Sequence, residues 1–183
     1  MRNHSMDPWL DDETLTKARP FAVGFKKKSG EPLVYGSFLL AACMLAVFLI
    51  TGSPEWGLIA IPMLGLAYWY YPMIAGWPQL GANDDGLFVE RIGFIHWACV
   101  EKVSLYETSV RTLVLHRAQI ILNRNLEEAI AKREAVAWWR YPMMRNWSLK
   151  KLENQRVMID VQLHTLSGDP HEICRALNAF LRR

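Results

Sequence analysis

Two long uncharged segments in the first half of the chain constrain its fold more than any other feature. The sequence has no Asp, Glu, Lys or Arg between Glu31 and Glu55, and none between Glu55 and Asp84. Apolar residues dominate these segments at positions 33 to 51 and 57 to 77. Because a helix rises about 1.5 Å per residue, each stretch would form a helix of roughly 28 to 32 Å, close to the thickness of a hydrocarbon core. We expect two transmembrane helices joined by a short link, and a pair of buried core helices is the alternative.

Prolines and aromatic residues in the second segment agree with a membrane helix. Pro62 and Pro72 would each interrupt a helix in a soluble protein, whereas packing in a membrane can accommodate the kinks. Trp and Tyr are concentrated near the two ends of the segment, as in the aromatic belts of membrane interfaces. The second helix is therefore expected to continue through residues 57 to 77.

Basic residues flank one side of this predicted helix pair. Six Lys and Arg residues precede the first apolar segment, and the five that lie nearest to it are Lys17, Arg19, Lys26, Lys27 and Lys28. The link at 52 to 56 has none, so the positive-inside rule predicts a multi-pass protein of the cell (inner) membrane with both termini in the cytoplasm. Residues 1 to 32 are expected to form a polar cytoplasmic tail. No cleaved signal peptide is expected, because the first apolar segment begins far from the N-terminus.

Cysteine usage and net charge argue against several kinds of site. The three cysteines, Cys43, Cys99 and Cys174, form no CxxC pair, so neither a disulfide nor a zinc site is expected. No motif for a metal or another cofactor is present, and we predict none. The net charge is only +3 and the basic residues form no stripe, which argues against nucleic acid as a partner.

Residues 78 to 183 have the pattern of a small α+β domain on the cytoplasmic side. A turn at 83 to 86 is followed by short apolar and alternating runs that predict antiparallel strands. The alternation is clearest at 157 to 163, where Val, Ile, Val and Leu fall on one face. Asp169 followed by Pro170 is a typical helix start, and the apolar spacing after it predicts an amphipathic helix that closes the domain.

A helical insert is expected within this domain at residues 125 to 156. Asn125 and Glu128 have the spacing of a capping box at a helix start. Pro142 would end the helix, because the residue before a proline is disfavoured in helical conformation.

One run of residues after the second apolar segment carries a family resemblance. It reads Asp84-Asp85-Gly86-Leu87, then Arg91, then Ile95-x-Trp97-x-x-Val100-x-x-Val103. This order of turn, basic residue and I-x-W-x-x-V pattern resembles small bacterial membrane proteins that have two transmembrane helices and a pleckstrin-homology-like (PH-like) domain.

The resemblance implies a partly open antiparallel barrel with a C-terminal capping helix and no known catalytic residues. It implies a structural role for Asp85, Gly86, Arg91, Ile95, Trp97 and Val100. Independently of the resemblance, a tryptophan on a strand near a turn can bury a large ring, which contributes roughly 2 to 3 kcal/mol. We therefore assign Trp97 to the core.

The stretch AVAWWRYPMMRNW, at positions 135 to 147, interleaves aromatic and basic side chains. Segments of this kind lie on anionic membranes by combining apolar insertion with electrostatic attraction. The residues predicted to contact the membrane surface are Trp138, Trp139, Arg140, Tyr141, Arg145, Trp147, Lys150 and Lys151. The alternative is that the tryptophans pack on the domain while the arginines are only solvated.

No catalytic motif was found among the residues that carry chemistry. The five histidines are dispersed, and the sequence lacks GxSxG, HExxH, Walker and GxGxxG patterns. The leading hypothesis is a non-catalytic, membrane-anchored PH-like module that binds anionic lipid headgroups or a protein partner. One alternative is an accessory subunit of a membrane protein complex, or a homo-oligomer, because small residues at Ser37/Ala41 and Ala42/Ala46 permit close helix packing. A membrane-tethered hydrolase is the remote alternative.

Overall fold

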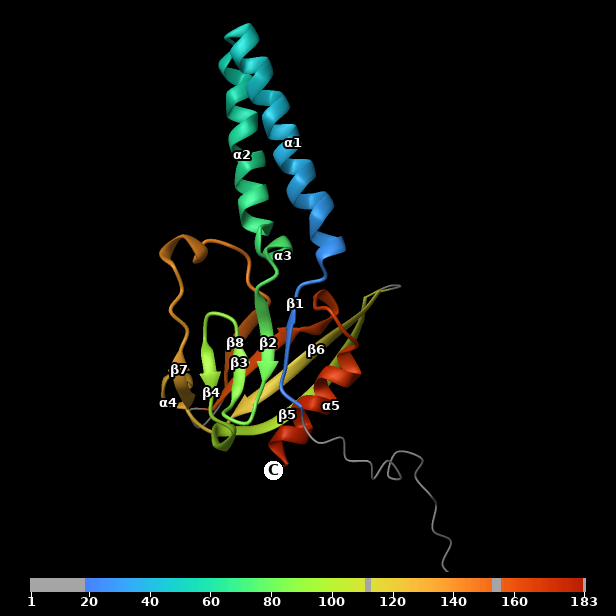
Figure 1. Ribbon diagram of the computed structural model, residues 1–183, viewed down its shortest axis with the longest axis vertical. Coiled ribbons are helices and arrows are strands. Elements are labelled where there is room, and N and C mark those ends of the chain that lie inside the picture. Colours follow the sequence, from blue (N-terminus) through green and yellow to red (C-terminus); the bar gives the residue numbers. More distant parts are fainter. Residues whose placement is uncertain (1–18, 111–112, 153–155, 183) are drawn as a thin grey trace, which may run out of the picture.

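The computed structural model describes residues 19–110, 113–152 and 156–182 and consists of a long helix pair that projects from an α+β domain (Figure 1). The α-helices are α1 Lys27–Thr51, α2 Pro54–Tyr70, α3 Pro72–Ala75, α4 Leu126–Ala129 and α5 Pro170–Leu181. The strands are β1 Phe21–Gly24, β2 Pro78–Ala82, β3 Leu87–Val89, β4 Gly93–Ile95, β5 Val100–Val110, β6 Leu113–Leu122, β7 Ile130–Arg133, β8 Trp147–Lys151 and β9 Val157–Gln162. Three short 3-10 helices are η1 Trp97–Cys99, η2 Trp138–Arg140 and η3 Leu163–Thr165.

Helix α1 is long and apolar enough to cross a membrane, and it is the one such helix among the described residues. Its 25 residues extend the expected segment at its N-terminal end. Gly52, with a φ of 69°, ends the helix in the left-handed conformation that glycine adopts without strain. This helix gives the chain an apolar segment suited to membrane association.

The expected uninterrupted helix at 57 to 77 is wrong, because the chain forms two helices there. Helix α2 has 17 residues and accommodates Pro62 in its interior. It ends at Tyr70, and Tyr71 donates its backbone N–H to the carbonyl of Tyr68 (3.3 Å) in a tighter turn. Pro72 has no N–H with which to continue the helical ladder, so a separate short helix, α3, begins at this residue.

Small residues lie where α1 and α2 pack together. Ser37 and Ala41 of α1 are buried, as are Ala60 and Ala67 of α2. Small side chains allow two helices to approach closely. The small residues Ser37 and Ala41, which the sequence offered for close helix packing, are thus already buried within this chain. The outward faces of both helices expose large apolar side chains, among them Leu39, Leu49, Ile50, Leu58 and Ile61.

Strand β1 precedes the helix pair yet belongs to the α+β domain. It pairs with β2 in an antiparallel register that places Phe21 opposite Ala82. The next residue, Phe25, is buried and forms a bridge with Leu166. The boundaries expected from sequence are therefore wrong in part: the segment at 1 to 32 is not a tail throughout, and the domain does not begin at residue 78. Residues 21 to 25 supply an edge strand and a core side chain.

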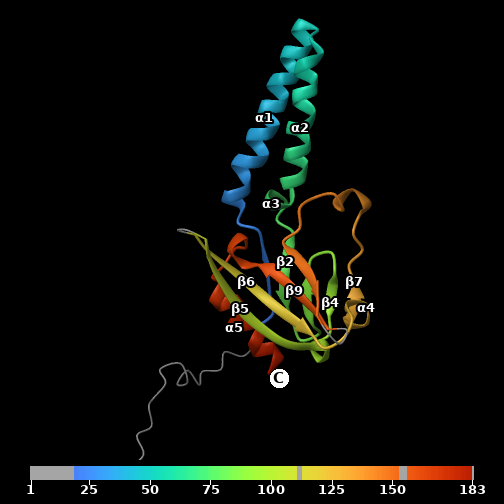
Figure 2. The same ribbon diagram turned by 180° about the vertical axis from the view of Figure 1, so that it is seen from behind.

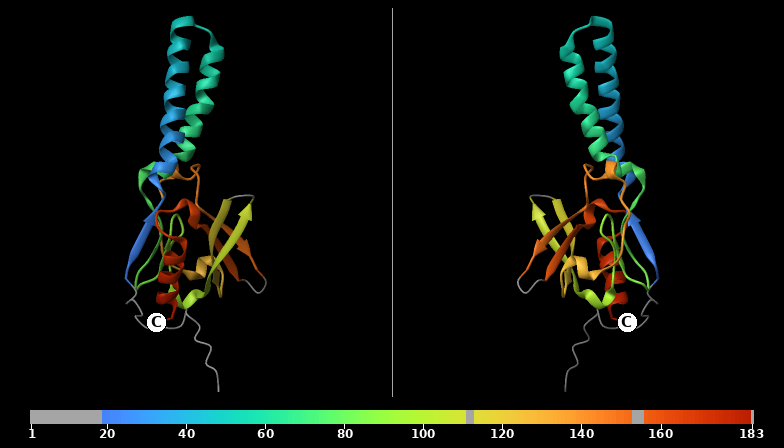
Figure 3. Two further views of the ribbon diagram at one scale, coloured as in Figure 1. Left: turned by 90° about the vertical axis from the view of Figure 1, so that its right-hand side faces the viewer. Right: turned by 90° about the vertical axis from the view of Figure 1, so that its left-hand side faces the viewer.

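Two antiparallel sheets enclose the core. The five-stranded sheet has the order β1-β2-β3-β4-β7, and the four-stranded sheet has the order β5-β6-β9-β8. Helix α5 lies at the open side between the edge strands β1 and β5, as Figures 1 and 3 show. The most buried large side chains of the core include Leu80, Leu87, Ile95, Ile120, Leu122, Ile159, Leu163 and Leu177.

The predicted C-terminal helix and the strand before it are confirmed. Asp169 caps α5 by accepting a hydrogen bond from the backbone N–H of Glu172 (3.1 Å). Ile173, Leu177 and Phe180 form its buried face. In β9, the side chains that the alternation assigns to one face, Val157, Ile159 and Val161, are buried in the core.

The helical insert expected at 125 to 156 is wrong. Helix α4 has four residues, and the chain then continues as β7, which pairs with β4. Gly93 of β4 lets the two backbones meet closely, because a side chain there would overlap the carbonyl of Lys132. Pairing with β4 satisfies the backbone groups that a longer helix would have bonded internally, and this tertiary interaction overrides the local helix signal. Later described residues of this range include η2 and β8.

Candidate functional site

The residues that carry the family resemblance extend from the turn before β3, through β4 and η1, into β5. The side chain of Asn83 accepts hydrogen bonds from the backbone N–H groups of Asp85 (3.1 Å) and Gly86 (2.9 Å). Gly86 lies where a side chain would overlap the carbonyl of Ile95. Arg91 adopts a φ of 65°, which closes the tight turn between β3 and β4. Asn83, Gly86 and Arg91 thus shape the turns at the two ends of β3.

Trp97 and its neighbours agree with the predicted core role. Trp97 packs partly buried against the core and stacks on Phe180 of α5, with 5.6 Å between ring centroids. Its indole N–H donates to the carbonyl of Asn83 (2.8 Å). Ile95 and Val100 are buried. The ring therefore joins the β2–β3 turn to the closing helix.

The aromatic loop, defined as residues 135 to 147, extends from β7 to the domain end of α2 (Figure 1). Met144 donates its backbone N–H to the carbonyl of Trp69 (3.1 Å), and the hydroxyl of Tyr68 donates to the carbonyl of Trp139. The ring of Trp139 also lies 5.9 Å from the ring of Trp77. Figure 2 shows the same loop from behind, beside α3 at the base of the helix pair. These contacts hold the loop at the level where the helices meet the domain.

Side chains of the loop divide between exposed and packed positions. Trp138 is 83% exposed and Tyr141 is 65% exposed, although both are large aromatic residues. Trp139 is 39% exposed. Trp147 is half-buried and donates its indole N–H to the carbonyl of Glu90 (2.7 Å). The two readings left open by the sequence thus apply to different residues, since Trp147 packs on the domain whereas Trp138 and Tyr141 protrude from it.

A buried ionic cluster anchors the loop to the five-stranded sheet. The cluster consists of Glu90, Arg91, Glu134 and Arg140. Glu90 is 1% exposed, and its Oε1 accepts hydrogen bonds from Arg91 Nε (3.0 Å) and Arg140 Nη2 (2.9 Å). Arg140 also reaches Glu134 Oε1 (3.4 Å), and its guanidinium lies 4.0 Å from the centre of the Trp77 ring. Arg140 is therefore held within the domain and does not present its charge freely to a membrane.

Arg91 fixes the far end of the loop through backbone carbonyls. Its guanidinium donates to the carbonyls of Met143 (3.1 Å) and Met144 (2.9 Å), and its backbone N–H donates to Glu134 Oε2 (2.6 Å). Charge-assisted hydrogen bonds of this kind are about twice as strong as neutral ones. The shape of the loop therefore depends on a side chain some fifty positions earlier in the sequence.

Burial raises the pKa of the Glu90 carboxyl above its usual value, and the positive charges of Arg91 and Arg140 offset part of this increase. The second oxygen, Oε2, finds no hydrogen-bond partner among the described residues. A carboxylate in this position depends on both arginines, because a buried charge without a partner is costly. Sequence reasoning missed Glu90, Glu134 and Trp77. A charged pair at the end of an apolar strand, Glu90-Arg91, was the available signal.

The basic residues predicted at the membrane surface are not all brought together. Arg145 is exposed, with its guanidinium 5.0 Å from the centre of the Trp147 ring. Lys150 and Lys151 are the last residues of β8, which runs away from the helix pair (Figure 1). Other basic residues lie nearer the helices, since exposed Lys27 and Lys28 open α1. The positive charge beside the helix pair therefore comes largely from the start of α1.

An apolar groove of about 600 Å³ lies where the helix pair meets the loop. Tyr35 and Phe38 of α1, Tyr68 of α2, and Trp139 and Met143 of the loop contribute to its lining. Its walls are predominantly hydrophobic and include few polar groups. The groove continues the apolar surface of the helices onto the domain.

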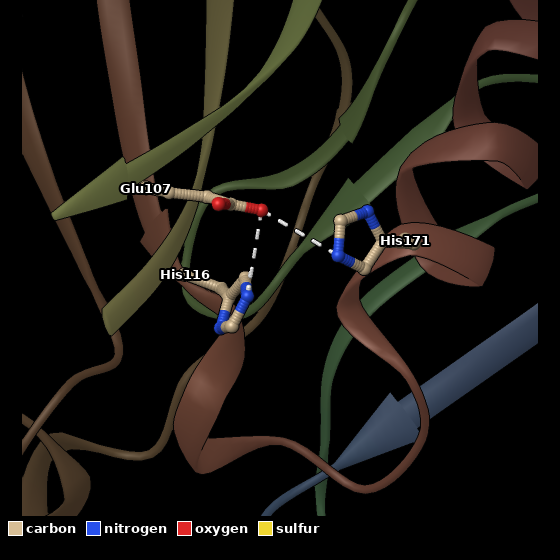
Figure 4. Close-up of side chains that lie close together, drawn as sticks. All are labelled: Glu107, His116 and His171. Atoms are coloured by element: carbon tan, nitrogen blue, oxygen red, sulfur yellow. Dashed lines mark ion pairs between the residues drawn. The ribbon is translucent and has the colours of Figure 1, made fainter. Parts of the chain in front are cut away.

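A second group of side chains that carry chemistry lies between the β5–β6 hairpin and the first turn of α5. Glu107 of β5, His116 of β6 and His171 of α5 point toward one another (Figure 4). Glu107 Oε1 lies 3.5 Å from Nε2 of each histidine. These are the residues of the described chain that have the composition and spacing to hold a metal ion.

Comparison of the chain with protein-family models, with curated proteins and with solved structures found no match.

Proposed function

We propose that this chain is a non-catalytic, membrane-anchored module whose aromatic loop rests in the headgroup layer of an anionic membrane surface. The observation that carries the proposal is the position of the loop. Hydrogen bonds to Trp69 and from Tyr68 hold it beside the base of the helix pair, while Trp138 remains 83% exposed. An exposed tryptophan at this level has the amphipathic ring that favours the membrane interface.

A hairpin anchor with two spans is part of the proposal. Strands β1 and β2 pair with each other, so the chain leaves the domain and re-enters it at the same place. If α1 crosses a bilayer, α2 must bring the chain back across it. Helix α2 has 17 residues, about 26 Å at 1.5 Å per residue, and α3 extends the apolar segment toward the domain. The exposed apolar faces of both helices support a lipid environment.

Positive charge at the base of the pair supports an anionic surface as the partner. Lys27 and Lys28 lie exposed in the first turn of α1, the end nearest the domain. Each basic residue near an anionic leaflet contributes on the order of 1 kcal/mol of attraction. By the positive-inside rule, we assign this end and the domain to the cytoplasmic side of the cell membrane.

The domain itself is proposed to be of the PH-like kind. Two antiparallel sheets with a C-terminal helix at their open side support this assignment, together with the structural roles of Gly86, Arg91 and Trp97. The proposal does not require a catalytic residue.

The depth of the aromatic loop in a bilayer tests the proposal. Spin labels are attached at Trp138→Cys and Tyr141→Cys in the full chain, with Cys43→Ala as background, and the protein is placed in lipid nanodiscs. We expect labels at both positions to collide more with oxygen than with a water-soluble nickel chelate. A label at Arg182→Cys serves as the control, because α5 ends far from the helix pair (Figure 1). A label at position 138 that is as accessible to nickel as the control would contradict the proposal.

The anionic part of the proposal needs a second comparison. Replacing part of the phosphatidylcholine with phosphatidylglycerol should increase the depth of the loop labels. The paired change Lys27→Gln and Lys28→Gln should abolish this dependence on lipid charge. The matched change Lys150→Gln and Lys151→Gln should preserve it, because those residues end β8 away from the helices. Equal depth in both lipids would show that charge has no part in docking.

A further inference from the structure

Three side chains from separate elements converge at the surface of the domain, away from the aromatic loop. They come from β5, β6 and α5. Glu107 and His116 are direct cross-strand partners in the β5–β6 hairpin. His171 lies in the first turn of α5, which packs against β5. Figure 4 shows the three side chains directed toward a common centre, with one carboxylate oxygen facing both imidazole rings.

The distances between these groups match the edges of a coordination tetrahedron. Zinc binds histidine nitrogen and carboxylate oxygen at about 2.0 to 2.2 Å, so the corresponding ligand atoms of a tetrahedral site lie about 3.3 to 3.6 Å apart. Glu107 Oε1 lies 3.5 Å from His116 Nε2 and 3.5 Å from His171 Nε2. All three atoms lie within 4.8 Å of one another, so the remaining edge closes with a small side-chain rotation. His171 is 57% exposed and has room for that movement.

The geometry points to a site for a divalent transition metal, with Zn²⁺ as the occupant that fits best, held by Glu107, His116 and His171. Two imidazoles and one carboxylate form a ligand set that zinc uses in proteins, whereas calcium and magnesium prefer oxygen ligands alone. Because two of the three side chains are about half exposed, water would complete the fourth position. The ion would also join the β5–β6 hairpin to the closing helix.

The proximity of Glu107 to the two histidines also has an explanation that needs no metal, namely ion pairing. A protonated histidine can pair with Glu107, and such exposed pairs contribute little to stability. The two explanations differ in what they require of the histidines, since a metal ligand must be neutral and an ion-pair partner must be protonated. Titration with metal therefore separates them.

The experiment measures binding of Zn²⁺, and of Co²⁺ as a spectroscopic probe, to the full chain in detergent. All proteins carry His4→Gln, which removes the histidine near the N-terminus. Competition with a chelating dye should give one zinc equivalent per chain, and Co²⁺ should give the visible absorption of a tetrahedral centre. His116→Gln, His171→Gln and Glu107→Gln should each weaken zinc binding at least about tenfold.

Two other histidines provide matched controls. His164 approaches the carbonyl of His116 through Nδ1 (3.4 Å) but lies outside the ligand set, and His96 is exposed elsewhere on the domain. His164→Gln and His96→Gln should leave zinc affinity unchanged. Unaltered circular dichroism would show that the ligand variants fold. Absence of stoichiometric binding, or equal affinity across ligand and control variants, would overturn the proposed site.

Discussion

At the scale of single residues, the position of the aromatic loop depends on one buried carboxylate. Glu90 lies almost fully buried and is neutralised by Arg91 and Arg140. Buried ion pairs often add little net stability, because desolvating the two charges offsets their attraction. Loss of one partner has a different effect, since the other charge then stays buried without compensation. The cluster therefore specifies where the loop lies more than it stabilises the domain.

Arg140→Met should destabilise the protein by about 3 to 5 kcal/mol, because it removes one of the two cations that compensate Glu90. It should also raise the pKa of Glu90 further, because the positive charge of Arg140 no longer stabilises the ionised carboxylate. Thermal or denaturant unfolding in detergent, followed by near-ultraviolet circular dichroism, measures the loss. Arg145→Met is the matched control and should cost less than about 1 kcal/mol, the usual size of an exposed cation–π contact. Equal effects of the two changes would contradict the role of the cluster.

At the scale of elements, the helix pair and strand β1 must be considered together. The pairing of Phe21 with Ala82 brings both ends of the helix pair to one edge of the sheet. Membrane crossing by α1 alone would separate β1 from β2 by the thickness of a bilayer. The predicted return of α2 is thus a consequence of strand pairing as well as of hydropathy.

Ser53→Cys, in the link between α1 and α2, should react with an impermeant maleimide from the side of the membrane opposite to Arg182→Cys. Sealed vesicles of both orientations provide the measurement. Cys43→Ala removes the exposed native thiol, and Cys99 is buried. Burial raises the pKa of Cys174 to about 11, so its thiol stays protonated and unreactive at neutral pH. Labelling of positions 53 and 182 from the same side would exclude the hairpin topology.

At the scale of the whole molecule, the helix pair is an insertion between two neighbouring strands of one sheet. A protein without residues before Pro78 lacks both the edge strand β1 and the core side chain of Phe25. Burial of a phenylalanine side chain contributes about 1.5 to 3 kcal/mol, and an unpaired sheet edge favours aggregation. The α+β domain therefore requires sequence from both sides of the helix pair.

A protein of residues 78 to 183 should be less stable, by more than about 2 kcal/mol, than one in which a short Gly/Ser linker replaces residues 26 to 77. The linker can be short because Gly24 and Pro78 are paired in the sheet. Denaturant unfolding compares the two proteins, and light scattering reports their aggregation. Equal stability would show that β1 contributes nothing to the domain.

The sequence by itself determined the features that depend on neighbouring residues. Runs without charge predicted the apolar helices, alternation predicted β9, and the Asp169-Pro170 start predicted α5. Local hydrogen bonds and periodic burial set all of these. The turn at Asn83 and the core position of Trp97 were predictable for the same reason.

Only the tertiary structure decided the features that depend on residues far apart in the chain. The local signal at Asn125 favoured a long helix, but pairing of β7 with β4 ended it after Ala129. Strand β1 is too short to be recognised without its partner β2. The tryptophans at 138 and 147 have similar local surroundings in the sequence, but a hydrogen bond to the carbonyl of the distant Glu90 holds Trp147 against the domain, whereas Trp138 is exposed. Long-range pairing of strands and charges selects among conformations that local sequence leaves nearly equal in free energy.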